Sequence, residues 1–218
     1  MGNSGRGRPG RLQRALRAAL LAVLAGAVFP QARAQNLFKL DSFDEREDKG
    51  IFSRSSQKRL DSLAIMGVVG LSLFEGTENR LGRASWQALD AGVTSAVTTE
   101  LMKRAFGRPR PSQNPDPSVW FAGSGNRSFP SGEVTLAAAV VTPFVLEYGH
   151  DHPAVYALEL IPLYDAVARM KTHGHWQTDV LAGWALGTAV GYYSHSRHES
   201  FTVGVLPRGI TVGWKAKF

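Results

Sequence analysis

Apolar residues at helical spacing fill the middle of the chain and limit the folds that it can adopt. In Ala84–Arg104 the large apolar residues recur every four positions, which places them on one face of a helix. Further helical segments are Leu60–Phe74, Gly132–Tyr148, Pro153–Lys171 and His175–Ser194. The sequence therefore predicts an all-α fold, a helical bundle. A membrane span needs about 18–20 consecutive apolar residues. The charge-free runs 134–146 and 180–194 are shorter, so a soluble or membrane-peripheral bundle is favoured over a membrane-inserted one.

The first 34 residues differ in composition from the rest of the chain. They hold six arginines and no acidic residue, followed by the apolar stretch Ala18–Phe29 and a small-x-small site at Ala32-Arg33-Ala34. This order is typical of a secretory signal peptide over residues 1–34. Without these arginines, the net charge of +7 falls close to zero, so the sequence does not indicate nucleic-acid binding. The chain has no cysteine, which excludes disulfides and thiol chemistry. We expect an exported, periplasmic protein.

Three further segments complete the predicted organisation. Residues 35–58 are polar and form an N-terminal arm or a solvated first helix, and residues 59–200 form the helical domain. Residues 201–218 predict a short C-terminal β-hairpin, because a Pro-Arg-Gly turn separates the alternating runs Thr202–Leu206 and Ile210–Trp214. Within the helical domain, Gly107–Pro130 is rich in proline and glycine. Loops of this length are usually functional or disordered, and we predict that this one faces a substrate.

Charged and polar residues gather in three short clusters. The first is Lys103 followed, after six residues, by Arg110-Pro111; the second is Pro130-Ser131-Gly132-Glu133; the third combines Arg169, His175 and Asp179. Arginine and lysine bind phosphate oxygens, and the free N–H groups of a helix that Ser131 can cap attract anions. His175 and Asp179 are four residues apart and would share a helix face. The carboxylate would fix one ring nitrogen and leave the other free to attack.

Each cluster also has an ordinary structural interpretation. Single surface cations usually form salt bridges, and a single His–Asp pair is more often a structural hydrogen bond. His173 beside His175 could suggest a metal pair, but no third ligand is apparent at short spacing. Only the combination of the three clusters favours a site that holds a phosphate and attacks it.

The three clusters together resemble the phosphatidic acid phosphatase type 2 superfamily, which includes bacterial acid phosphatases, lipid phosphatases and vanadium haloperoxidases. The resemblance covers residues 60–195, and its spacing selects Arg110 over Arg108 and His175 over His173. It implies a helical bundle and hydrolysis of phosphate esters through a phosphohistidine, without a metal or other cofactor. His175 would be the nucleophile and Asp179 would orient it. The phosphoryl oxygens would be held by Lys103, Arg110, Ser131, Gly132 and Arg169.

Two residues depart from the family pattern. Ala168 replaces a serine, and Glu133 replaces the histidine that protonates the leaving group in the family. Glu133 can act as a general acid if burial raises its pKa, whereas an ionised Glu133 would repel phosphate. The expected substrate is a lipid phosphate or a small phosphomonoester. The alternatives are a catalytically weak phosphate- or phospholipid-binding protein and a vanadate-dependent peroxidase. Association with a membrane surface stays open, and the sequence does not indicate the oligomeric state.

Overall fold

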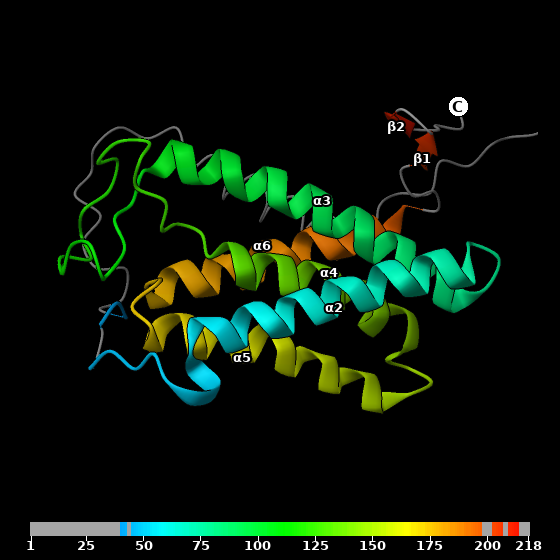
Figure 1. Cartoon of the computed structure of the whole chain (residues 1–218), viewed down its shortest axis with the longest axis horizontal. Helices are drawn as coiled ribbons and strands as arrows, with labels where there is room; N and C mark the ends of the chain where they lie inside the picture. The colour runs from blue at the N-terminus through cyan, green and yellow to red at the C-terminus, as the bar shows by residue number, and fades with distance from the viewer. Residues whose placement is uncertain (1–39, 43–44, 198–201, 207–208, 214–218) are drawn as a thin grey trace, which may run out of the picture. The chain divides into compact units, whose positions relative to one another are not determined.

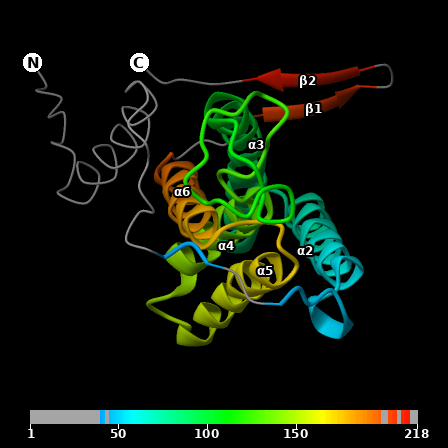
Figure 2. The same ribbon diagram turned by 90° about the vertical axis from the view of Figure 1, so that its left-hand side faces the viewer.

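Helices make up most of the part of the chain that the structure, a computed structural model, describes: residues 40–42, 45–197, 202–206 and 209–213. In chain order they are the 3-10 helix η2 (Gly50–Phe52), α2 (Arg54–Glu75), α3 (Arg80–Phe106), α4 (Gly132–Tyr148), the 3-10 helix η3 (Pro153–Glu159), α5 (Leu160–Lys171) and α6 (Gln177–Ser196). They lie side by side (Figure 1), and α4 packs against α3, α5 and α6, as the end-on view shows (Figure 2). The predicted helical bundle is confirmed.

Small residues allow α6 to lie close against α4. A Cβ atom at Gly187 would lie 2.2 Å from the carbonyl oxygen of Thr135, and one at Gly191 would lie 2.6 Å from Cβ of Thr142. Ala138 and Ala139 are fully buried in the same interface. The close approach holds the first turns of α4 and α6, which carry two of the sequence clusters, at a fixed separation.

Gly107 ends α3 and starts the long loop. Its φ of 46° is left-handed, and a Cβ atom there would lie 2.6 Å from the carbonyl oxygen of Gly123. The loop returns to the end of α3 through the backbone hydrogen bond from Phe121 N to Phe106 O (2.8 Å). Trp120 and Phe129 stack edge-on with ring centroids 5.1 Å apart. The predicted irregular segment is therefore an ordered loop, folded back on the end of α3.

Several helix bounds differ from the prediction by a few residues, and two differences are larger. Residues 54–58, predicted as part of the polar arm, belong to α2, which begins earlier because Ser53 Oγ accepts a hydrogen bond from Ser56 N. The single helix predicted over Pro153–Lys171 is divided between η3 and α5. Pro162, in the first turn of α5, contributes to this division, because it cannot donate a hydrogen bond to Leu158 in η3.

The two ends of the chain are described in part. The predicted signal peptide, residues 1–34, lies outside the described residues. Near the other end, β1 (Thr202–Leu206) pairs antiparallel with β2 (Gly209–Gly213), and Val203 lies opposite Val212. Residues 207–208 and 214–218 of the predicted hairpin lie outside the described part. Among the helices described, none has the length and apolar character that crossing a membrane requires.

Candidate active site

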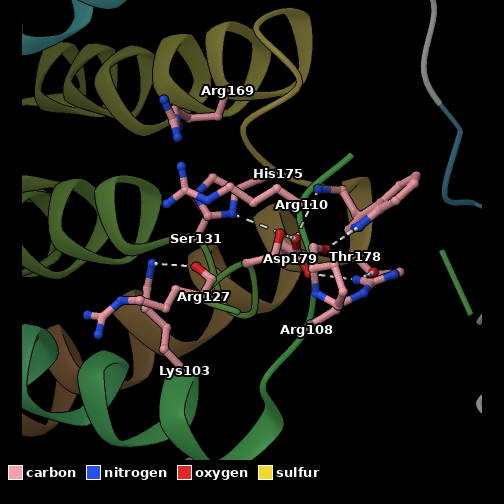
Figure 3. A network of polar contacts seen from close by, with 12 residues as sticks. Lys103, Arg108, Arg110, Arg127, Ser131, Arg169, His175, Thr178 and Asp179 are labelled. Atoms are coloured by element: carbon pink, nitrogen blue, oxygen red, sulfur yellow. Dashed lines mark hydrogen bonds and ion pairs between the residues drawn. The ribbon is translucent and has the colours of Figure 1, made fainter. Parts of the chain in front are cut away.

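The three sequence clusters meet at one end of the bundle. Lys103 comes from the last turn of α3, Ser131 from the start of α4 and Arg169 from the last turn of α5. His175 lies in the turn before α6, and Asp179 lies in the first turn of that helix. Figure 3 shows these side chains gathered in one region. Residues up to 76 positions apart in the chain therefore form a single polar site.

His175 lies between two carboxylates. Its ring is buried, with Nδ1 3.6 Å from Asp179 Oδ2 and Nε2 3.7 Å from Glu133 Oε2. Neither nitrogen has a hydrogen-bond partner among the described residues. The predicted pairing of His175 with Asp179 is present, but the predicted helical geometry is wrong. α6 starts only at Gln177, because Trp176 is extended (φ −78°, ψ 160°), and Asp179 reaches back toward the preceding turn.

Asp179 is fixed by several donors. Its carboxylate accepts hydrogen bonds from Arg108 Nη1 (2.6 Å), Ser128 Oγ (2.5 Å) and Trp176 N (3.0 Å). Burial alone would raise the pKa of Asp179, but His175, Arg108 and Ser128 outweigh it and lower the pKa below its ordinary value. Asp179 therefore stays ionised and holds one side of the His175 ring.

Arg108 positions Asp179 and was not predicted as a site residue. Its guanidinium is 1% exposed and also donates to Asp41 Oδ2 (2.7 Å) and to Thr178 Oγ1 (2.8 Å). Thr178 N donates to the other oxygen of Asp41 (2.8 Å), and the Arg108 guanidinium lies over the Trp120 ring at 4.2 Å. Asp41 lies in the segment predicted as a polar arm, and its burial is a correction to that prediction. The two arginines of Arg108-Pro109-Arg110 were the available signal, but Asp41 is too distant in sequence for any pattern to reveal.

Four of the predicted phosphate-binding side chains, Lys103, Arg110, Ser131 and Arg169, lie in the same region as His175 (Figure 3). We call these side chains, together with the backbone N–H of Gly132, the anion pocket. Gly132 lies beside Lys103, because a Cβ atom at Gly132 would be 3.5 Å from Lys103 Nζ. The three cations interact electrostatically with one another. Burial lowers the pKa of Lys103 to about 8, with Glu133 opposing the shift, and burial also lowers the pKa of Arg169. Glu133 is an anion that interacts with Lys103 and Arg169 in the unliganded protein.

Ser131 behaves differently from the prediction. Its side chain makes no capping hydrogen bond to α4, so the predicted N-cap bond is wrong. Ser131 Oγ is buried and has no hydrogen-bond partner among the described residues. Ser131 N donates to Asp179 O (3.0 Å), which ties the start of α4 to α6. A hydroxyl without a partner beside three cations can donate to a bound anion.

Glu133 is an ionised carboxylate at the edge of the anion pocket. It accepts a hydrogen bond from Arg54 Nη2, and its Oε2 lies 3.8 Å from Arg169 Nε. Burial would raise the pKa of Glu133, but His175, Arg169 and Arg54 together lower it far below its ordinary value. The sequence left two alternatives for Glu133, and the lowered pKa favours the ionised carboxylate in the unliganded protein. Arg54, at the start of α2, is a second site residue that the sequence clusters did not reveal.

An apolar cavity adjoins Glu133. It has a volume of about 380 Å³ and is lined mainly by aliphatic side chains of α2 and α4, among them Val68, Leu136 and Val140. Asp61 and Glu133 are the acidic residues of its lining. Among the residues described, no group of three His, Asp or Glu side chains is placed to hold a metal ion.

Sequence comparisons with known proteins match this chain to lipid A 1-phosphatases. Lipid A 1-phosphatase of Porphyromonas gingivalis is 36% identical over 90 residues, which cover 41% of this chain and 18% of the relative. Lipid A 1-phosphatases of Rhizobium johnstonii (33% over 100 residues) and Rhizobium etli (32% over 107 residues) match 44% and 47% of this chain.

The chain spans less than half the length of each of these relatives: 18%, 40% and 44%. No solved structure matches it significantly. The family model of the PAP2 superfamily matches residues 85–202, just over half of the chain, and this range contains all three clusters. The chain therefore belongs to the PAP2 superfamily.

Proposed function

We propose that the protein hydrolyses phosphate esters of lipids through a phosphohistidine. The observation that carries the proposal is the setting of His175: Asp179 lies beside Nδ1, and Nε2 faces the anion pocket without a hydrogen bond. A phosphate ester resists attack because its oxygens repel the nucleophile, so charge neutralisation and positioning are the main catalytic tasks. The anion pocket supplies both.

The reaction proceeds in two displacements. His175 Nε2 attacks phosphorus, the P–N bond forms, and the ester P–O bond breaks. The leaving oxygen takes up a proton and departs as the alcohol. The Asp179 carboxylate accepts a hydrogen bond from Nδ1–H of His175 and stabilises the positive charge that develops on the ring. Water then attacks the phosphohistidine, releases inorganic phosphate and restores the neutral imidazole. The cations hold the phosphoryl oxygens in both steps, so the proposed chemistry requires no metal.

Three observations support a lipid substrate. The apolar cavity of about 380 Å³ reaches Glu133, beside the anion pocket, and has room for part of an acyl chain. The matched relatives are named as lipid A 1-phosphatases. Large apolar side chains are exposed on α2: Leu63, Met66, Leu73 and Phe74. We propose that this face associates with a membrane surface, and the composition of residues 1–34 supports export to the periplasm.

Phosphate release by the full chain tests the proposal. The substrates are a lipid phosphate in detergent micelles and a soluble aryl phosphate, both with a chelator present. We expect release from the lipid, and a loss of at least about a thousandfold in His175→Ala. The control is His150→Ala, because His150 is fully exposed and far from the site. Acid-labile, alkali-stable labelling by a radioactive substrate should appear in wild type and not in His175→Ala.

The second candidate is a phosphate- or phospholipid-binding protein with little turnover. The ionised Glu133 carboxylate favours it, because that carboxylate repels a phosphate and cannot donate a proton. Binding of the lipid phosphate without release of phosphate, equal in wild type and His175→Ala, would support this candidate and exclude the first.

A further inference from the structure

The Glu133 carboxylate lies where an anionic ligand would be held. Arg54 donates to one of its oxygens, and the other lies 3.8 Å from Arg169 Nε and 3.7 Å from His175 Nε2. Arg169 and His175 are the groups to which the proposed function assigns the phosphoryl group (Figure 3). Because carboxylate and phosphoryl oxygens make the same charge-assisted contacts with guanidinium groups, Glu133 and a bound phosphate compete for the same cations.

Arg54 reaches the anion pocket through Gln57. Arg54 Nη1 donates to Gln57 Oε1 (3.2 Å), and Arg169 Nη1 lies 3.4 Å from the same oxygen. Gln57 is fully buried, and its Nε2 donates to Phe52 O (2.8 Å), which fixes the side-chain amide. One fixed amide oxygen therefore holds two guanidinium groups side by side. Arg54 belongs to none of the three sequence clusters.

The charges around Glu133 come from every element packed near it. They are Arg54 and Asp61 from α2, Lys103 from α3, Asp165 and Arg169 from α5, and His175 from the turn before α6. In the unliganded protein the cations outweigh the effect of burial. If a phosphoryl dianion binds the cations, Glu133 loses their stabilisation of its carboxylate. Its burial, its two acidic neighbours and the bound dianion then all act on its pKa. Each of these changes favours the protonated carboxyl group.

We propose that Arg54 and Glu133 are an exchangeable ion pair in which an incoming phosphoryl group displaces the Glu133 carboxylate from Arg54 and Arg169, and the displaced carboxylate takes up one proton. The inference rests on the proposed function only in its catalytic step. There, the Glu133 carboxyl group gives its proton to the ester oxygen as the P–O bond breaks and the P–N bond to His175 forms. Glu133 is then a carboxylate again and can accept a proton from the water that attacks the phosphohistidine.

Sulfate binding to the full chain tests the exchange without requiring turnover. Sulfate is tetrahedral and stays a dianion between pH 6 and 8, so any proton taken up on binding is taken up by the protein. Calorimetry at pH 7 in buffers of different ionisation enthalpy measures that uptake. We expect wild type to take up about one proton more than Glu133→Gln does. For each unit by which the pH rises, the sulfate affinity of wild type should fall up to about tenfold more than that of Glu133→Gln. The same comparison between His175→Asn and the double variant His175→Asn/Glu133→Gln gives the difference without His175.

Arg54 is tested in the background that lacks its partner. In Glu133→Gln, the further change Arg54→Gln should weaken sulfate binding at least about fivefold, because Arg54 then contacts only the anion. The matched control is Arg59→Gln, an exposed arginine on the same helix, which should leave the affinity unchanged. Circular dichroism melting of each variant checks that the fold persists.

Two results would overturn the inference. One is equal proton uptake by wild type and Glu133→Gln. The other is an unchanged sulfate affinity when Arg54 is replaced in the Glu133→Gln background. Proton-linked sulfate binding without release of phosphate from any ester would instead refute the proposed function and leave the exchange standing.

Discussion

At the scale of single residues, the neighbouring arginines Arg108 and Arg110 differ in burial and in their charged neighbours. One proline separates them, yet Arg108 is fully buried between two carboxylates, whereas Arg110 is half-buried among the cations of the anion pocket. The family resemblance identified Arg110 by spacing. It gave no role to Arg108, because that role depends on Asp41, which lies 67 positions earlier in the chain.

Replacing Arg108 should cost more than replacing an exposed arginine. Arg108→Ala leaves Asp41 and Asp179 buried without their cation, so we expect a loss of about 3–5 kcal/mol in the free energy of unfolding. Arg104→Ala removes an exposed ion pair with Glu100, and its expected cost is below about 1 kcal/mol. Urea unfolding of both variants at pH 7 measures the difference. Equal losses would show that the buried pairs do not hold the site together.

At the scale of helices, the contact between α4 and α6 sets the site geometry. Ser131 and Glu133 lie at the start of α4, and Asp179 lies in the first turn of α6. The backbone bond from Ser131 N to Asp179 O joins the two helix starts directly. The distance between nucleophile and anion pocket therefore depends on how closely these helices pack.

A side chain at Gly187 should separate the two helices. Because its Cβ atom would lie 2.2 Å from Thr135 O, Gly187→Ala forces a backbone shift, with an expected loss of about 1–3 kcal/mol in the free energy of unfolding. Gly67→Ala on α2 meets no atom within 4 Å and should stabilise the protein by about 0.5–1 kcal/mol through helix propensity. Thermal or urea unfolding compares them. A neutral or stabilising Gly187→Ala would contradict the close packing.

At the scale of the whole molecule, one buried acid links stability to pH. Asp165 is fully buried on α5, and neither of its carboxyl oxygens accepts a hydrogen bond among the described residues. Burial, followed by the neighbouring Asp61, raises the pKa of Asp165 to about 8. At neutral pH the native protein therefore keeps a proton on Asp165 that the unfolded chain, with an ordinary pKa of 3.8, has lost.

The sign of this effect is fixed by the raised pKa. The stability that Asp165 contributes is complete below about pH 4 and is lost as the pH rises to about 8. Between pH 5 and pH 8, the free energy of unfolding of Asp165→Asn should therefore rise by about 1–3 kcal/mol relative to that of wild type. The control is Asp116→Asn, an exposed residue whose pKa is lowered and which stays ionised over this range. Urea unfolding at pH 5 and pH 8 gives the free energy of unfolding of each protein. The same change between the two pH values in wild type and in Asp165→Asn would refute the raised pKa of Asp165.

The sequence by itself predicted most of the helical segments and the residues that we assign to the anion pocket. Helical periodicity depends on neighbours along the chain, which is why Gly132–Tyr148 was predicted with the bounds that α4 has. Cluster spacing, through the family resemblance, selected Lys103 and His175, and the structure brings both to one end of the bundle.

Only the tertiary structure decided the charge state and the partners of those residues. The pKa of Glu133 depends on Arg54 and Arg169, which lie 79 positions before it and 36 positions after it. Burial and opposite charge act on a carboxyl group in opposite directions, and their balance depends on distances that only packing sets. For the same reason the sequence did not predict Asp41 and Arg54 as site residues. Electrostatic contact depends on the distance between side chains in space, whereas a sequence pattern records only position along the chain.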